Sequence, residues 1–74
     1  MTNLITAAVT VFLIGTIDNV EDGIASVEIT DSNYEVRYTD IPVELFPCRA
    51  VEGGMFYFAN VNDVTEIRCG EPDA

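Results

Sequence analysis

The side chains that could do chemistry in this chain are nearly all carboxylates. Thirteen Asp and Glu residues stand against three arginines, and the 74 residues include neither lysine nor histidine, so the formal charge is −10. The general bases and Schiff-base nucleophiles that enzymes use most often are therefore missing. A pair of carboxylates can hydrolyse a glycoside, but it needs a cleft, and a very small β-barrel is filled by its own side chains. We predict no enzymatic activity and no cofactor.

One segment, residues 18–23, resembles a calcium-binding loop. Asp18, Asn19, Glu21 and Asp22 place three carboxylates and one amide oxygen close together in the sequence. Calcium takes six to eight oxygen ligands, and the spacing of an EF-hand loop with its final glutamate is not met. Asp22-Gly23 is also typical of a tight hairpin turn, which needs positive φ angles. We interpret the segment as a solvated turn and predict no metal site.

Cys48 and Cys69 are the only cysteines. Two thiols without a histidine cannot supply the four ligands of a structural zinc site, and the spacing is not that of a Cys-x-x-Cys redox motif. Free thiols in a reducing compartment are the interpretation we favour. A disulfide is the alternative, because a small domain gains much of its stability from such links.

The longest uncharged stretch, residues 2–17, contains four threonines and is too short and polar for a membrane span, which needs roughly 20 apolar residues. The first basic residue is Arg37, whereas a secretory signal peptide begins with positive charge. We therefore expect a cytoplasmic protein that does not enter membranes. The strong negative charge also argues against direct binding of nucleic acid, because it repels phosphates.

Alternating apolar and polar residues predict β-strands along most of the chain. The first predicted strand runs from Val9 to Ile17, is buried on both faces near its middle, and has Gly15 as its bend point. Asp40-Ile41-Pro42 is expected to end the third strand, because proline has no N–H to donate. The other predicted elements are strands at 25–30, 34–39, 55–59 and 64–69, a hairpin turn at 22–23 and a short helical turn at 43–46.

Five short strands cannot hide their apolar faces in a flat sheet of this size. We predict an all-β fold with one domain over residues 1–74. Its sheet is expected to form a small five-stranded antiparallel barrel, closed or nearly closed, or a strongly bent sheet, of the SH3-like or OB-like kind. The polar tail at 70–74 is expected to fray.

Five aromatic residues are candidates for a partner-binding surface: Tyr34, Tyr38, Phe56, Tyr57 and Phe58. Because Phe56 and Phe58 alternate with Tyr57 along one predicted strand, one of the two sets must point away from the core. Aromatic residues that stack nucleic-acid bases lie in basic grooves, so a protein partner is expected instead. Arg37 is expected to pair with Glu28 or Glu35.

Six carboxylates are candidates for an acidic surface: Asp18, Glu21, Asp22, Glu28, Asp31 and Glu35. The predicted function is an interaction module that binds a protein with a basic or apolar patch, with self-association as an open alternative. A second hypothesis is a nucleic-acid mimic of the phage or mobile-element type that occupies the basic groove of a nucleic-acid enzyme. Carboxylates spaced like phosphates along one face would favour mimicry, whereas most of them fall at predicted turns. A third is that the acidity only adapts the protein to salt or keeps it soluble.

Several short motifs resemble a family of short acidic β-proteins that is described only as a domain of unknown function. The motifs are Ile17-Asp18, Glu21-Asp22, Ile24 to Glu28, Asp40-Ile41-Pro42, Leu45-Phe46-Pro47 and Val51-Glu52-Gly53. The resemblance covers the middle half of the chain, which departs from the family by an N-terminal extension and by the cysteine after Leu45-Phe46-Pro47. It implies a single β-barrel module. The family has no assigned activity, so it implies no site residues.

Overall fold

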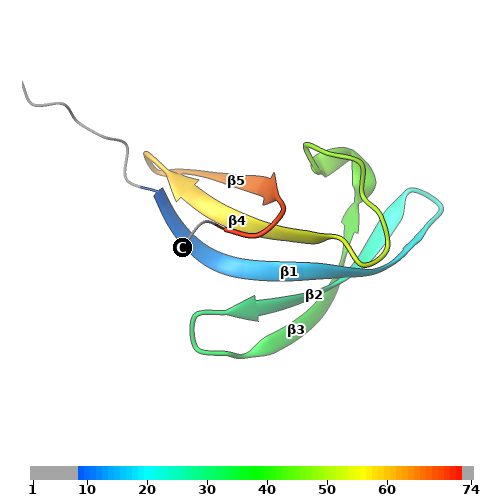
Figure 1. The fold of residues 1–74 in the computed structure, drawn as a ribbon, viewed down its shortest axis with the longest axis horizontal. Coiled ribbons are helices and arrows are strands. Elements are labelled where there is room, and N and C mark those ends of the chain that lie inside the picture. Colours follow the sequence, from blue (N-terminus) through cyan, green and yellow to red (C-terminus); the bar gives the residue numbers. More distant parts are fainter. Residues whose placement is uncertain (1–8, 73–74) are drawn as a thin grey trace, which may run out of the picture.

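The fold is a single antiparallel sheet of five strands, shown in Figure 1 by a computed structural model that describes residues 9–72. The strands are β1 (Val9–Glu21), β2 (Ile24–Asp31), β3 (Val36–Pro42), β4 (Met55–Val61) and β5 (Val64–Cys69), and a 3-10 turn, η1 (Val43–Leu45), follows β3. Their order in the sheet is β3-β2-β1-β4-β5. The predicted all-β class and the short helical turn are confirmed.

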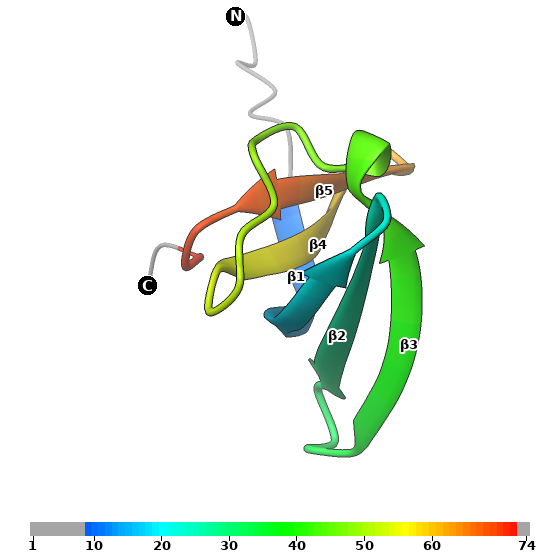
Figure 2. The ribbon, with the colours of Figure 1, turned by 90° about the vertical axis from the view of Figure 1, so that its right-hand side faces the viewer.

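Strand β1 lies at the centre of the sheet and pairs with β2 on one side and β4 on the other. The register shifts against β2 between Ile17 and Asn19, and against β4 between Val11 and Leu13. Such β-bulges bend a strand and increase its twist, so the sheet curls strongly, as Figure 2 shows. Gly15, the predicted bend point, lies between the two bulges.

The curled sheet does not close into a barrel. Strands β3 and β5 are the two ends of the strand order, and each pairs with only one neighbour among the described residues. Of the predicted forms, the strongly bent sheet is the one observed. Two strands therefore keep one unpaired edge each.

Tyr34 lies in the turn between β2 and β3, and not in the third strand where the sequence pattern placed it. Its φ angle is 63°, outside the extended region. The turn is held by the carboxylate of Asp31, which accepts hydrogen bonds from the N–H groups of Asn33 at 2.8 Å and Glu35 at 3.0 Å. This local bonding competes with strand pairing and delays the start of β3 to Val36.

Strand β3 ends at Pro42, as predicted, but Asp40-Ile41-Pro42 does not stop the ladder with β2 before that point, because all three residues still belong to the strand. Pro42 pairs in register with Ile24. Backbone bonds mark the two ends of this ladder, because the N–H of Asp31 donates to the carbonyl of Glu35 and the N–H of Val43 donates to that of Gly23. Since backbone groups point alternately to the two sides of an antiparallel strand, the nitrogen of Pro42 faces away from β2 and no ladder bond is lost.

The core lies on one face of the sheet, here called the covered face, and consists of Ile17, Ala25, Val27, Ile41, Phe46 and Phe56. Residues 43–54 connect β3 to β4 and contribute the buried ring of Phe46, so we call them the 43–54 connection. Its end is tied to β1 by backbone bonds, from the N–H of Ile17 to the carbonyl of Gly54 and from the N–H of Gly53 to the carbonyl of Ile17, both at 2.8 Å. The opposite side of the sheet is called the open face.

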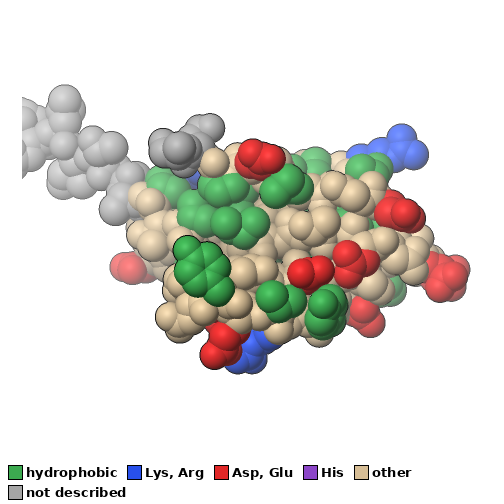
Figure 3. Space-filling model, turned by 60° about the horizontal axis from the view of Figure 1, so that its bottom comes forward, with side chains coloured by type: hydrophobic (Ala, Val, Ile, Leu, Met, Phe, Trp, Pro, Cys, Tyr) green, Lys and Arg blue, Asp and Glu red, His purple; other side chains and the backbone are tan. Residues whose placement is uncertain are grey.

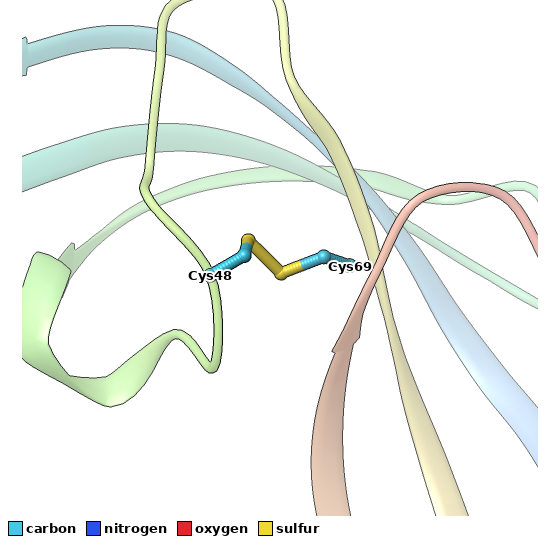
Figure 4. Close-up of a disulfide and its surroundings, with 2 residues drawn as sticks. All are labelled: Cys48 and Cys69. Atoms are coloured by element: carbon cyan, nitrogen blue, oxygen red, sulfur yellow. A yellow bond between two sulfur atoms is a disulfide. The ribbon is translucent and has the colours of Figure 1, made fainter.

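Cys48 and Cys69 form a disulfide, so the prediction of free thiols is wrong. Their Cα atoms are 6.4 Å apart although 21 positions separate them in the sequence. The fold brings them together because the 43–54 connection returns across the sheet to the end of β5, as Figure 4 shows. The bond fixes this connection over the core.

The helical content of the described residues is the single turn η1, and nothing helical between residues 9 and 72 has the length and apolar character of a membrane span. At the C-terminus, the N–H of Gly70 donates to the carbonyl of Met55 at 2.8 Å. The rest of the tail expected to fray includes residues 73 and 74, which lie outside the described part of the chain.

Candidate interaction surface

The five aromatic residues proposed from the sequence do not share one surface. Phe56 is fully buried in the core, where its ring meets that of Phe46 edge to face at 5.1 Å between centroids, so it cannot contact a partner. Phe58 is half-buried on the same covered face and packs against Phe12. Tyr57 lies on the open face opposite Arg68 of β5. Side chains along β4 alternate between the two faces as expected, but two of the candidates, Phe56 and Phe58, point to the covered face.

Tyr34 and Tyr38 are the aromatic candidates that solvent reaches. Tyr34 is 87% exposed in the turn after β2, and Tyr38 is 72% exposed on β3. Tyr38 pairs across the sheet with Glu28, which in turn pairs with Thr16 of β1, so all three side chains share the open face. Of the five predicted aromatic residues, Tyr38 is the one that lies on a strand with its side chain mostly exposed to solvent.

The six carboxylates of the predicted acidic surface fall into separate groups. Asp18, Glu21 and Asp22 lie where β1 turns into β2, whereas Asp31 and Glu35 lie at the other end of β2. Glu28 lies between them on the open face. The carboxylates therefore do not follow one another along a single edge or row of the sheet.

The open face carries exposed apolar side chains that the sequence pattern assigned to the interior. Val9 is 49% exposed and Ile14 is 42% exposed, although the first strand was predicted to be buried on both faces near its middle. The other exposed aliphatic side chains and the methionine on this face are Val11, Ile24, Val36, Met55 and Val64. Figure 3 shows hydrophobic side chains gathered towards the end of the sheet where the described part of β1 begins, with most carboxylates away from them.

The burial of β1 was predicted wrongly because a run of β-branched residues occurs both in strands covered on two faces and in strands covered on one face. The 43–54 connection covers only the side of the sheet that bears Ile17 and Phe56. The two cases differ in whether another element covers the second face. That depends on the fold of the whole chain and cannot be seen in the pattern of one strand.

No strand between residues 9 and 72 pairs with the outer edge of β3. The backbone N–H and C=O groups of Val36, Tyr38 and Asp40 point away from β2, by the same alternation that directs Pro42 outward. The side chains from Val36 to Asp40 are all exposed. At β5, by contrast, the disulfide at Cys69 holds the 43–54 connection against the end of the strand. Of the two edges, β3 is the more accessible to another chain.

Two hollows border β3, one on each face of the sheet. The hollow on the open face has a volume of about 380 Å³, and its polar lining is Asp18, Ser26, Tyr38 and Asp40. Within it the hydroxyl of Ser26 donates to Oδ1 of Asp40 at 3.1 Å. The second hollow, of about 490 Å³, lies on the covered face. Its lining is mixed and consists of Leu13, Ile29, Asp31, Glu35, Arg37, Tyr38 and Thr39.

Two arginines form ion pairs within their own strands or turns. Arg37 Nη2 lies 3.6 Å from Oε2 of Glu35, one of the two partners predicted for it; Glu28 lies on the other face. Arg68 Nε lies 3.5 Å from Oε2 of Glu66. The hydrogen bond with the Tyr57 hydroxyl and then that with the Glu66 carboxylate raise the pKa of Arg68 above its ordinary value. The guanidinium of Arg68 is thus a fixed positive charge beside the apolar part of the open face.

The segment that resembles a calcium loop forms a hairpin turn, in which Asp22 and Gly23 have φ angles of 53° and 78°. Between residues 9 and 72, no three carboxylate or cysteine side chains are grouped as metal ligands would be. The buried residues of that same range include no polar or charged side chain.

Comparisons with models of protein families, with curated proteins and with solved structures found no match for this chain. The resemblance to a family of short acidic β-proteins accordingly stays a prediction.

Proposed function

We propose that this chain is a non-enzymatic interaction module that binds another protein through the open face of its sheet and the adjoining edge of β3. The observation that carries this proposal is the unpaired edge of β3, bordered on the same face by Tyr38 and exposed apolar side chains. Edge strands that remain free are templates for pairing with another chain. Clustered apolar side chains on a surface are typical of sites where another molecule binds.

The distribution of ionisable groups supports a binding role over catalysis. A catalytic carboxylate usually has a pKa shifted by burial or by a close neighbour, and it lies in a cleft that excludes water. The carboxylates of residues 9–72 are all at least partly exposed, half of them on strands and half in turns or connections. This arrangement supports the prediction that the protein is not an enzyme.

The carboxylates also support the interaction module over nucleic-acid mimicry. A mimic needs negative charges that repeat along one surface as phosphates repeat along a strand. Here the groups at the two ends of β2 are separated by the length of that strand, with Glu28 between them. We therefore propose a protein partner with a basic or apolar patch, with a second copy of the chain as the alternative.

The compartment in which the module works is part of the proposal. A cytoplasmic location was expected from the sequence, but disulfides are rare in reducing compartments and persist in oxidising ones. The Cys48–Cys69 bond favours an oxidising environment.

Site-directed photo-crosslinking tests the proposed function. A photoreactive phenylalanine analogue replaces Tyr38 or Ile14 on the open face, and replaces Leu45 of η1 in the control, because Leu45 is also exposed but lies on a different surface. We expect covalent adducts with a protein from the producing cells at the two open-face positions only, with or without added DNA. Absence of adducts at both positions, or adducts that DNA abolishes, would contradict the proposal, and the second result would support mimicry.

A further inference from the structure

We propose that β3 binds an extended segment of alternating basic and apolar residues, which joins the sheet as a sixth strand. This inference rests on the proposed interaction function and specifies the chemistry of the partner. It comes from three features that meet at β3: its outward backbone groups, the acidic hollow on the open face, and the hollow on the covered face that contains Leu13 and Ile29.

The backbone of β3 supplies the first part of the recognition. Val36, Tyr38 and Asp40 each present one N–H and one C=O on the free side of the strand. An extended segment can satisfy these groups as β-strands do, and this kind of pairing gives affinity without regard to sequence. Pro42 has no N–H to offer and marks the end of the edge, so the pairing extends over the stretch from Val36 to Asp40.

The open-face hollow selects basic side chains. A residue of the added strand that lies opposite Tyr38 or Asp40 points its side chain to the open face, because directly opposed residues share a face. There it reaches the carboxylates of Asp18 and Asp40 and the ring of Tyr38, which line the hollow. An ammonium or guanidinium group gains from the two charges and from the face of the aromatic ring.

The covered-face hollow selects the alternate residues of the added strand. These lie opposite Arg37 or Thr39 and point towards Leu13 and Ile29. The charges at this position already have partners, because Arg37 lies 3.6 Å from Glu35 and the Asp31 carboxylate accepts two backbone N–H groups of the turn. The two aliphatic side chains therefore favour an apolar residue. Because successive side chains of a strand point to opposite faces, one segment meets both requirements only if basic and apolar residues alternate.

Charge complementarity favours such a segment over a second copy of this chain. Antiparallel pairing of two β3 strands about Tyr38 would place Val36 opposite Asp40 of the second copy and bring no basic side chain to the acidic hollow. It would also join two chains that each carry a formal charge of −10. A basic segment instead reduces the repulsion around β3.

The test uses the whole disulfide-bonded chain and an eight-residue peptide of alternating lysine and valine. Binding is measured by isothermal titration, and hydrogen exchange of individual amides is followed by NMR. We expect slower exchange of the amides of Val36, Tyr38 and Asp40 when the peptide is bound, because these are the outward N–H groups. A peptide of alternating glutamate and valine, and a lysine–valine peptide methylated at alternate backbone nitrogens on the pairing side, are both expected to bind at least tenfold more weakly.

Variants of the chain locate the site. Asp40→Asn is expected to weaken binding of the lysine–valine peptide by about two- to fivefold, the range for one exposed charge pair. Glu21→Gln removes an exposed carboxylate outside the hollow and is expected to leave binding unchanged. Val36→Pro removes an outward N–H without breaking the β2–β3 ladder, and it is expected to reduce binding by more than tenfold. Thermal unfolding checks that this variant folds, and Asp40→Asn provides the test if it does not.

Besides failure of the lysine–valine peptide to bind, three results would overturn the inference. The first is equal binding of the glutamate–valine peptide, and the second is unchanged affinity after backbone methylation. The third is protection of the β3 amides that rises with protein concentration in the absence of peptide, which would make a second copy the occupant. If the lysine–valine peptide fails to bind while the photo-crosslinking at Tyr38 succeeds, this inference is wrong and the interaction function stands.

Discussion

The ring of Phe56 lies directly on the backbone of Gly15, its cross-strand partner in the β1–β4 ladder. A Cβ atom added to Gly15 would fall within 2.7 Å of ring atom Cε2 of Phe56, closer than Cβ atoms come to other atoms in real structures. The glycine is therefore required by the close approach of the largest fully buried side chain. The bending of β1 that was predicted for Gly15 comes instead from the two bulges on either side of it.

Replacing Gly15 by alanine is expected to lower the free energy of unfolding by roughly 1–3 kcal/mol, the usual cost of overpacking a core. Chemical denaturation measures the change. The double variant Gly15→Ala/Phe56→Leu is the matched control, because a smaller side chain leaves room for the added methyl group. Its loss of stability should be less than the sum of the two single losses. Strict additivity would show that the ring and the glycine do not constrain each other.

Removing the disulfide with Cys48→Ser/Cys69→Ser is expected to lower the free energy of unfolding by about 3 kcal/mol, from the entropy of the closed loop. The 43–54 connection covers the core, so its release also exposes Phe46. Thermal unfolding with and without reductant is the measurement. Reductant should destabilise the wild type by a similar amount and leave the double variant unaffected. An unchanged melting temperature of the wild type in reductant would contradict the assignment.

Asp31→Ala is expected to lower the free energy of unfolding by about 1 kcal/mol, because two backbone N–H groups of the β2–β3 turn lose their acceptor. The amides of Asn33 and Glu35 should then exchange faster with solvent. Asp31→Asn keeps one acceptor oxygen and is expected to lose less stability. Equal exchange rates in wild type and Asp31→Ala would show that the turn does not depend on this side chain.

The strands and turns could be predicted from the sequence because their signals are local. The turn at Asp22-Gly23 and the strand from Val64 to Cys69 are observed where the alternation and turn residues placed them. The late start of β3 has a local cause that the alternation does not show, the hydrogen bonds that the Asp31 carboxylate accepts in the preceding turn. The pairing of Pro42 with β2 was not predicted, because the effect of a proline on a ladder depends on which side of the strand its nitrogen faces.

The candidate surface was less predictable because it depends on contacts between distant parts of the chain. Tyr38 was proposed only as a candidate for partner contact, and its 72% exposure became known from the structure. Likewise, nothing in the pattern around Phe56 distinguishes it from Tyr57 until the core side of β4 is known. The disulfide depends on the return of the 43–54 connection to β5. The hollows beside β3 depend on three strands at once, and their lining residues include Asp18 and Asp40, which look like ordinary turn residues in the sequence.

Added sodium chloride is expected to raise the melting temperature of the protein. The folded chain gathers thirteen carboxylates and three arginines on a small surface, and salt screens the resulting repulsion over distances of about 10 Å at 0.1 M. Each kcal/mol of repulsion removed should raise the melting temperature by roughly 4–8 °C for a domain of this size. The control is Glu44→Gln/Glu52→Gln, which removes two exposed carboxylates and changes the formal charge from −10 to −8. This variant should respond less to salt, and an equal response would show that salt acts on apolar burial and not on the carboxylates.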